Sequence, residues 1–203
     1  AVLPIERCLL AAQDPAHARV LDRRWPGSTS VDVVVPSDGP AVVVPVPVGE
    51  RAVPEVTEVV EVDYPSWESR GHVEGRFTVS ARGFWQVHPG AAQTFLGMVM
   101  AMLDPRPGET ALDLYSGVGL FSAGLAEAVG SSGRVVAVES DAVAVAHARR
   151  NLAAYGQVVT VAARVDDFFG VARPKRRGPT PRRATRPRAP RRHPLAPPAA
   201  DLV

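Results

Sequence analysis

The feature that most restricts the fold of this chain is an alternation of apolar runs and amphipathic stretches between residues 110 and 161. Each apolar run is short enough for a buried strand, and each amphipathic stretch is long enough for a helix. Strands that alternate with helices predict a parallel sheet with helices packed on it. The strands are expected over Thr110–Tyr115, Val135–Glu139 and Val158–Val161, and the helices over about Leu120–Val129 and over Ala142–Tyr155, ending at Gly156.

The turn between the first strand and the first helix carries the sequence Asp-Leu-Tyr-Ser-Gly-Val-Gly over residues 113–119. Gly117 and Gly119 allow the backbone to turn tightly and to approach a ligand without a Cβ in the way. The helix that follows offers unpaired N–H groups to the same ligand. Glu139 lies 20 residues after Gly119, at the end of the next strand. An acid there can accept hydrogen bonds from both ribose hydroxyls of an adenosine-type cofactor.

Two classes of nucleotide cofactor fit this pattern, NAD and S-adenosylmethionine. The dinucleotide fingerprint has a third small residue three positions after the second glycine, and Ser122 stands there, which does not exclude NAD. Asp113, however, places a carboxylate beside the glycine turn, and an anionic pyrophosphate is repelled by it. A cationic sulfonium tolerates it, so the pattern favours S-adenosylmethionine. The alternative without function is a tight turn with a chance surface glutamate.

The first 82 residues predict a small α+β region rich in antiparallel strands. A weak helical pattern over about 7–24 ends at Pro26-Gly27. Two β-branched runs surround Ser-Asp-Gly-Pro at 37–40, which predicts a hairpin. Two further runs alternate as half-buried strands do. The strands are expected over Val31–Pro36, Ala41–Val48, Val56–Val62 and Arg76–Ser80.

A helix is expected between the two regions, because Pro89 suits the first turn of a helix and Asp104-Pro105 ends one. Phe95, Val99, Met102 and Leu103 recur as an apolar stripe on one face of that helix, which predicts that this face is buried.

Two motifs in order resemble the RNA uracil-5-methyltransferases. The first is Gly-Phe-Trp-Gln-Val-His-Pro over 83–89, which is similar to the family's Phe-x-Gln-Val-Asn segment. The second is the 112–122 segment around the glycine turn, followed by Val-Ala-Val-Glu over 136–139. The resemblance is strong over about 75–155 and looser over 1–74, where the family carries a β-rich substrate domain. It implies a Rossmann-like methyltransferase core that uses S-adenosylmethionine to methylate C5 of uridine in tRNA or rRNA.

The resemblance also assigns roles to single residues. Gln86 is expected to face the amino-acid end of the cofactor, Tyr115 to lie near its methionine part, and Glu139 to hold its ribose. With the glycine turn, the expected cofactor-binding set is Gln86, Asp113, Tyr115, Gly117, Gly119 and Glu139. Two positions depart from the family. His88 stands where Asn is common, which puts a neighbouring polar contact in question. Leu120 stands where some members carry Asn, which puts one hydrogen bond to the cofactor in question.

The family's catalytic residues are expected to be absent from this chain. In the family a cysteine attacks C6 of uracil and a later glutamate removes the C5 proton, and both follow an Asp-Pro-x-Arg segment on a fourth strand. The chain reaches its tail before any such segment. Cys8, the single cysteine, lies far upstream in the other region and does not correspond to the nucleophile. We expect it to be a small buried residue of the core. No catalytic residue is therefore assigned, and the isolated chain is expected to be inactive.

The tail over 171–203 differs sharply from the rest of the chain. It holds ten of the 23 lysines and arginines, eight prolines and one acid, so residues 1–170 carry 13 basic and 20 acidic residues, a net charge of −7. Such a composition predicts disorder. The tail is either an RNA-binding arm or the product of a reading-frame error. We favour the second, because the tail begins where the fourth strand is expected and has no aromatic residue for base stacking.

The expected organisation is a β-rich region over 1–82, an incomplete Rossmann-like domain over 83–170 and a disordered tail over 171–203. The expected partner is tRNA or rRNA. We expect a cytoplasmic monomer without a metal site or membrane span, since no apolar run is long enough for one. Three alternatives stay open: a non-catalytic domain that binds cofactor or RNA, a truncated fragment that folds poorly, and, more remotely, a dehydrogenase. The sequence does not identify the RNA or the uridine.

Overall fold

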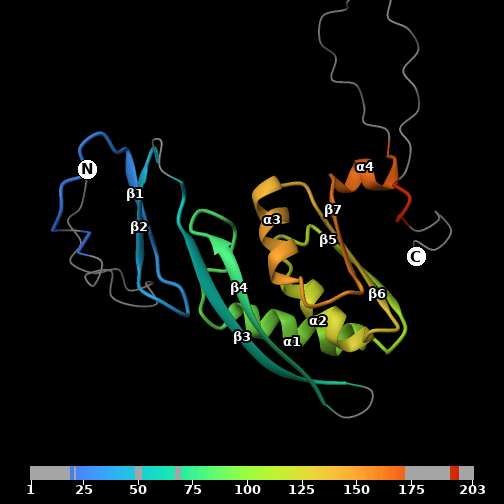
Figure 1. Cartoon of the computed structure of the whole chain (residues 1–203). Coiled ribbons are helices and arrows are strands. Elements are labelled where there is room, and N and C mark those ends of the chain that lie inside the picture. Colours follow the sequence, from blue (N-terminus) through green and yellow to red (C-terminus); the bar gives the residue numbers. More distant parts are fainter. Residues whose placement is uncertain (1–18, 21, 49–51, 67–69, 172–192, 197–203) are drawn as a thin grey trace, which may run out of the picture.

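The computed structural model describes residues 19–20, 22–48, 52–66, 70–171 and 193–196 (Figure 1). Cys8 and most of the basic tail lie outside these residues. The elements in chain order are β1 (Ser30–Val34), β2 (Val42–Val46), β3 (Glu55–Pro65), β4 (Arg70–Ser80), α1 (Ala91–Leu103), β5 (Thr110–Leu114), α2 (Leu120–Val129), β6 (Arg134–Glu139), α3 (Ala142–Asn151), β7 (Val158–Ala162) and α4 (Val165–Phe169).

The first four strands form two antiparallel hairpins. In the shorter one, β1 pairs with β2, with Val34 opposite Val42 across the turn that the Ser-Asp-Gly-Pro sequence predicts. In the longer one, β3 pairs with β4 from Glu55 opposite Ser80 to the far end of both strands. All four predicted strands are confirmed. The first half of β4 has two glycines and little strand propensity, and it becomes extended because β3 supplies a partner along its whole length.

The last three strands form the predicted parallel sheet, in the order β5-β6-β7. Figure 1 shows α2 and α3 packed beside this sheet. Residues 135–138 of β6 are all buried, which explains why this strand appears in the sequence as an unbroken apolar run. The fold class predicted from the sequence, an α/β methyltransferase-like core preceded by antiparallel strands, is therefore confirmed.

The predicted buried face of α1 is wrong. Phe95, Met102 and Leu103 are 44%, 72% and 61% exposed, and the helix instead buries a line of residues spaced four apart: Ala92, Leu96 and Met100. The helix is apolar around most of its circumference, so periodicity alone does not single out one face. The buried face is the one that packs against β3 and α2.

The third helix is shorter than predicted. It ends at Asn151, and residues 152–154 form a turn, so Gly156 does not end the helix. The Asn151 side chain, at this end of the helix, bonds to backbone groups of β4 and of the loop before α2. The helix expected over 7–24 lies mostly outside the described residues. In its described part, Arg23 N–H bonds to Val20 O, which forms a turn.

A short helix, α4, follows β7 and was not expected from the sequence. Phe168 of α4 is fully buried against the sheet face formed by Val136, Val138 and Val161. The His193 ring stacks on Phe168 with their centroids 5.4 Å apart, and Leu195 and Ala196 pack on the same cluster. This short part of the tail thus adds apolar contacts to the second face of the sheet.

The main core continues from the hairpins into the parallel sheet. One cluster of buried side chains includes Val60 and Phe77 of the long hairpin, Leu96 of α1, and Ala126 and Val135 of the parallel unit. The two regions are therefore packed together, and the loop between β5 and α2 (residues 115–119, named here the cofactor loop) lies near their junction. No helix in the described part of the chain is long and apolar enough to cross a bilayer.

Candidate cofactor site

The site is built around the loop that joins β5 to α2. Three of its residues have left-handed backbone angles: Tyr115 at φ 61°, Gly117 at φ 55° and Gly119 at φ 95°. A Cβ on Gly119 would lie 2.7 Å from Cδ1 of Leu152, so this glycine is required for the close approach of α2 to the end of α3. A Cβ on Gly117 would meet nothing within 4 Å. Gly117 therefore keeps open the face of the loop that a ligand can approach, whereas Gly119 serves packing.

Glu139, at the carboxyl end of β6, reaches across to this loop. Its Oε2 accepts a hydrogen bond from Gly117 N–H at 3.0 Å, and its Oε1 accepts from the N–H groups of Ser140 at 2.6 Å and Asp141 at 2.8 Å. These bonds fix the carboxylate at the junction of two strand ends. A carboxylate oxygen has two acceptor positions, and Oε1 uses both for these N–H groups, so the free position for a ligand hydroxyl is on Oε2.

Asp113 lies behind the loop rather than in it. Its carboxyl group is buried and accepts a hydrogen bond at 2.6 Å from the Ser122 hydroxyl, in the first turn of α2, and it also bonds to the Ser122 backbone. Burial raises the pKa of Asp113, the bonds from Ser122 oppose that rise, and the charge of Glu139 adds to it. The negative charge sits where the partial positive charge of the helix N-terminus stabilises it.

These two carboxylates decide which charge the site accepts. In a dinucleotide site, the N–H groups of the glycine loop and of the helix donate hydrogen bonds to an anionic pyrophosphate. Here Glu139 takes the N–H of Gly117, and Asp113 takes bonds from Ser122. An anion at this position would meet two carboxylates, while a cationic sulfonium would be stabilised by them. An acid at the position of Glu139 is common to both classes of cofactor, so Asp113 is the carboxylate that favours S-adenosylmethionine over NAD.

Two cavities meet at this loop. The larger, about 600 Å³, is within the roughly 300–1,000 Å³ of small-molecule sites and has Tyr115, Gly117 and Glu139 in its wall. The second, about 110 Å³, is lined by Gln86 together with Tyr115 and Gly117. Tyr115 is 74% exposed, so its ring is available to a ligand. Of the six predicted residues, Gln86, Tyr115, Gly117 and Glu139 are thus brought together around joined cavities, and Asp113 and Gly119 support the loop from behind.

Ser116 adds a polar group that the sequence analysis did not single out. Its hydroxyl oxygen is buried and has no hydrogen-bond partner, and the residue lines the smaller cavity. A buried hydroxyl without a partner is costly, and a polar ligand group would relieve that cost. This orphaned group is an independent sign that the cavity beside the glycine loop receives a polar ligand.

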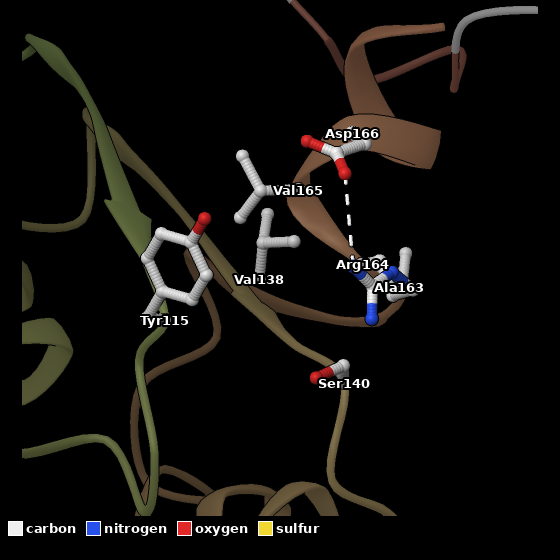
Figure 2. Close-up of a pocket in the computed structure, with 7 residues that line it drawn as sticks. All are labelled: Tyr115, Val138, Ser140, Ala163, Arg164, Val165 and Asp166. Atoms are coloured by element: carbon white, nitrogen blue, oxygen red, sulfur yellow. Dashed lines mark ion pairs between the residues drawn. The ribbon is translucent and has the colours of Figure 1, made fainter. Parts of the chain in front are cut away.

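A third hollow, of about 70 Å³, lies at the carboxyl ends of β6 and β7 (Figure 2). Figure 2 shows Tyr115 on one side of it and Val165 and Asp166 on the other, with Ser140 below. Arg164 forms an ion pair with Asp166 at 3.7 Å beside it. Because Tyr115 lines this hollow as well as the two larger cavities, its side chain stands where all three meet.

Asn151 is a supporting residue that sequence reasoning missed. Its Oδ1 accepts from Thr78 N–H, and its Nδ2 donates to the carbonyl oxygens of Thr78 and Val118. It therefore ties β4 to the cofactor loop from the end of α3. The only local signal was an asparagine in an otherwise apolar or basic helix end, which by itself indicates a cap.

A family model and a solved structure each match part of this chain. A family model for protein-L-isoaspartate(D-aspartate) O-methyltransferase matches residues 86–173, which contain the cofactor loop and the parallel sheet. A solved structure, the Pyrococcus abyssi tRNA (uracil-54, C5)-methyltransferase with S-adenosyl-L-homocysteine, is 25% identical. The match covers 48% of this chain and 23% of that one, with a TM-score of 0.36.

Curated relatives match more of the chain than the family model does. An uncharacterized RNA methyltransferase of Streptomyces coelicolor is 37% identical over 76% of this chain and 37% of its own length. A 23S rRNA (uracil(1939)-C(5))-methyltransferase of Methylococcus capsulatus is 33% identical over 66% of this chain and 27% of its own. The chain thus spans about a third of the length of these relatives. Over the part that it covers, the chain is similar to RNA methyltransferases, and a relative named for uracil-C5 methylation is among them.

Proposed function

We propose that this chain provides the cofactor-binding part of an RNA methyltransferase that transfers a methyl group to C5 of uridine in tRNA or rRNA. The observation that carries the proposal is the pairing of two carboxylates, Glu139 and Asp113, with the N–H groups of the glycine loop and of the helix behind it. The uridine specificity is supported by the relatives named for uracil-C5 methylation.

The described residues divide the binding of the cofactor between them. Glu139 accepts a hydrogen bond from the ribose through its Oε2. Gln86, in the wall of the smaller cavity, faces the amino-acid end, and the exposed Tyr115 ring packs against the methionine part. S-adenosylmethionine supplies an electrophilic methyl group when it is bound. The buried charge of Asp113 remains in place behind the loop and favours the cationic sulfonium.

The test is calorimetric titration of the purified chain with S-adenosylhomocysteine, comparing wild type with Glu139→Ala. Loss of one hydrogen bond to a charged acceptor costs about 1.5–3 kcal/mol, so affinity is expected to fall by about tenfold to 100-fold. Glu109→Ala is the matched control, because Glu109 is an exposed carboxylate at the opposite end of the sheet that bonds to Arg106 N–H. It is expected to leave the affinity unchanged.

Two results would contradict the proposal. One is a folded chain that binds NADH more tightly than S-adenosylhomocysteine, which would restore the dehydrogenase alternative. The other is an equal affinity of wild type and Glu139→Ala, which would show that the carboxylate does not hold the ligand. A thermal melt of each variant separates loss of binding from loss of fold.

A further inference from the structure

A charged side chain occupies a core-facing position in β3. The buried residues of this strand alternate, and Glu58 stands between Val56 and Val60 on the same inward face. Glu58 is only 9% exposed. Among the described residues its one hydrogen bond comes from the backbone N–H of Ser37, at 3.1 Å. Burial of a carboxylate with a single neutral donor is unfavourable, so its presence on the apolar face calls for a further partner.

Glu58 lies in the wall of a cavity of about 240 Å³, where three parts of the chain meet. Ser37 belongs to the turn between β1 and β2, Trp85 to the segment before α1, and Gln93 to the first turns of α1. The Oε1 of Gln93 is buried and has no hydrogen-bond partner. The cavity therefore holds a second acceptor that nothing in the described part of the chain satisfies.

This cavity adjoins the cofactor site. It shares Trp85, Gln86 and Ala92 with the smaller of the two cofactor cavities, so the two lie on either side of the same short segment. Nearby, Phe84 and Val87 are 81% and 96% exposed. A substrate that places its reacting base at the cofactor would extend over this segment and cover those apolar side chains.

The hydrogen-bonding groups that line this cavity determine which nucleobase it can bind. A carboxylate and an amide oxygen are acceptors, and they bind a base edge that offers amino or ring N–H donors, as cytosine, adenine and guanine do. Uracil offers one N–H between two carbonyl oxygens, and those oxygens would face the Glu58 carboxylate. The uridine to be methylated does not fit here, whereas an amino-bearing neighbour does.

We infer that the cavity between β3, α1 and the Trp85–Val87 segment is a second nucleobase site, which binds an amino-bearing base next to the target uridine through Glu58 and Gln93. The inference rests on the proposed function, since it assumes an RNA substrate. It makes Glu58 and Gln93 specificity-determining residues and assigns them no part in the chemistry.

The test measures the affinity of the full chain, saturated with S-adenosylhomocysteine, for fluorescein-labelled RNA by anisotropy. Two probes are compared, a short oligouridine and the same oligomer with one internal uridine replaced by guanosine. One hydrogen bond to a charged group corresponds to about tenfold or more in affinity, so the guanosine probe is expected to bind about tenfold more tightly. Glu58→Gln and Gln93→Leu are each expected to reduce this preference.

Glu61→Gln is the matched control for Glu58→Gln. It removes the same charge from the same strand, but Glu61 is exposed on the opposite face, so any general gain in RNA affinity from lost repulsion appears in both variants. Thr94→Val, at an exposed position beside Gln93, controls for the change in α1. Both controls are expected to keep the preference for the guanosine probe.

Equal binding of the two probes, absence of RNA binding, or a preference that survives in Glu58→Gln would each overturn the second base site. S-adenosylhomocysteine affinity, measured on the same samples, separates this failure from others. If the cofactor analogue binds and the base preference is absent, the cofactor site stands and the inference fails. If the analogue does not bind to folded chain, the proposed function fails.

Discussion

Replacement of Asn151 by alanine is expected to loosen the junction between the long hairpin and the cofactor loop. The side chain makes three hydrogen bonds, to Thr78 N–H at 2.9 Å, to Thr78 O at 3.1 Å and to Val118 O at 3.0 Å. Each is worth about 0.5–1.5 kcal/mol net, so the free energy of unfolding is expected to fall by about 3 kcal/mol. For a chain of this size that corresponds to a fall of about 6–12 °C in Tm.

The assay is urea unfolding followed by far-UV circular dichroism, with a thermal melt on the same protein. Arg149→Ala is the control, because Arg149 is an exposed neighbour on the same helix and its truncation is expected to change stability by no more than about 0.5 kcal/mol. If Asn151→Ala destabilises the chain no more than Arg149→Ala, the hydrogen bonds of this junction do not hold the two parts together, and the reasoning is refuted.

Two further predictions concern packing and pH. Gly119→Ala combines left-handed backbone strain with a contact of 2.7 Å between the new Cβ and the Leu152 side chain. The free energy of unfolding, measured in urea, is therefore expected to fall by about 2–4 kcal/mol, and a fall of less than about 1 kcal/mol would contradict this. Burial, and then the charge of Arg150, lowers the pKa of His147. As the pH falls, the unfolded chain is protonated at this histidine at a higher pH than the folded chain. The free energy of unfolding is therefore expected to decrease below about pH 6.5, and to decrease less in His147→Gln. Identical pH profiles of the two proteins in urea unfolding would argue against this.

Local sequence was sufficient for the strands and for the centre of the cofactor site. The apolar run of β6 predicts its strand because a strand buried on both faces must be apolar throughout, and the shorter apolar runs of β5 and β7 flank it in the sheet. The glycine loop and Glu139 could also be placed, since their spacing puts a turn and an acid at the carboxyl ends of neighbouring parallel strands. These conclusions depend only on residues close together in the chain and on the fixed geometry of strands and helices.

The tertiary structure decided what depends on contacts between distant residues. The α1 helix is apolar around most of its surface, so only the positions of β3 and α2 select Ala92, Leu96 and Met100 for burial. The end of α3 is held in place by Asn151, whose partners on β4 and in the cofactor loop lie far away in sequence.

The tertiary structure also decided which residues of the motif face a ligand and which support the loop. Gly119 and Asp113 appear in the motif beside Gly117, yet they serve packing and the start of α2, because Leu152 and Ser122 lie against them. A sequence pattern shows which residue types are present at a turn. Which of them face a ligand, and which face the protein, depends on the elements that pack behind the turn.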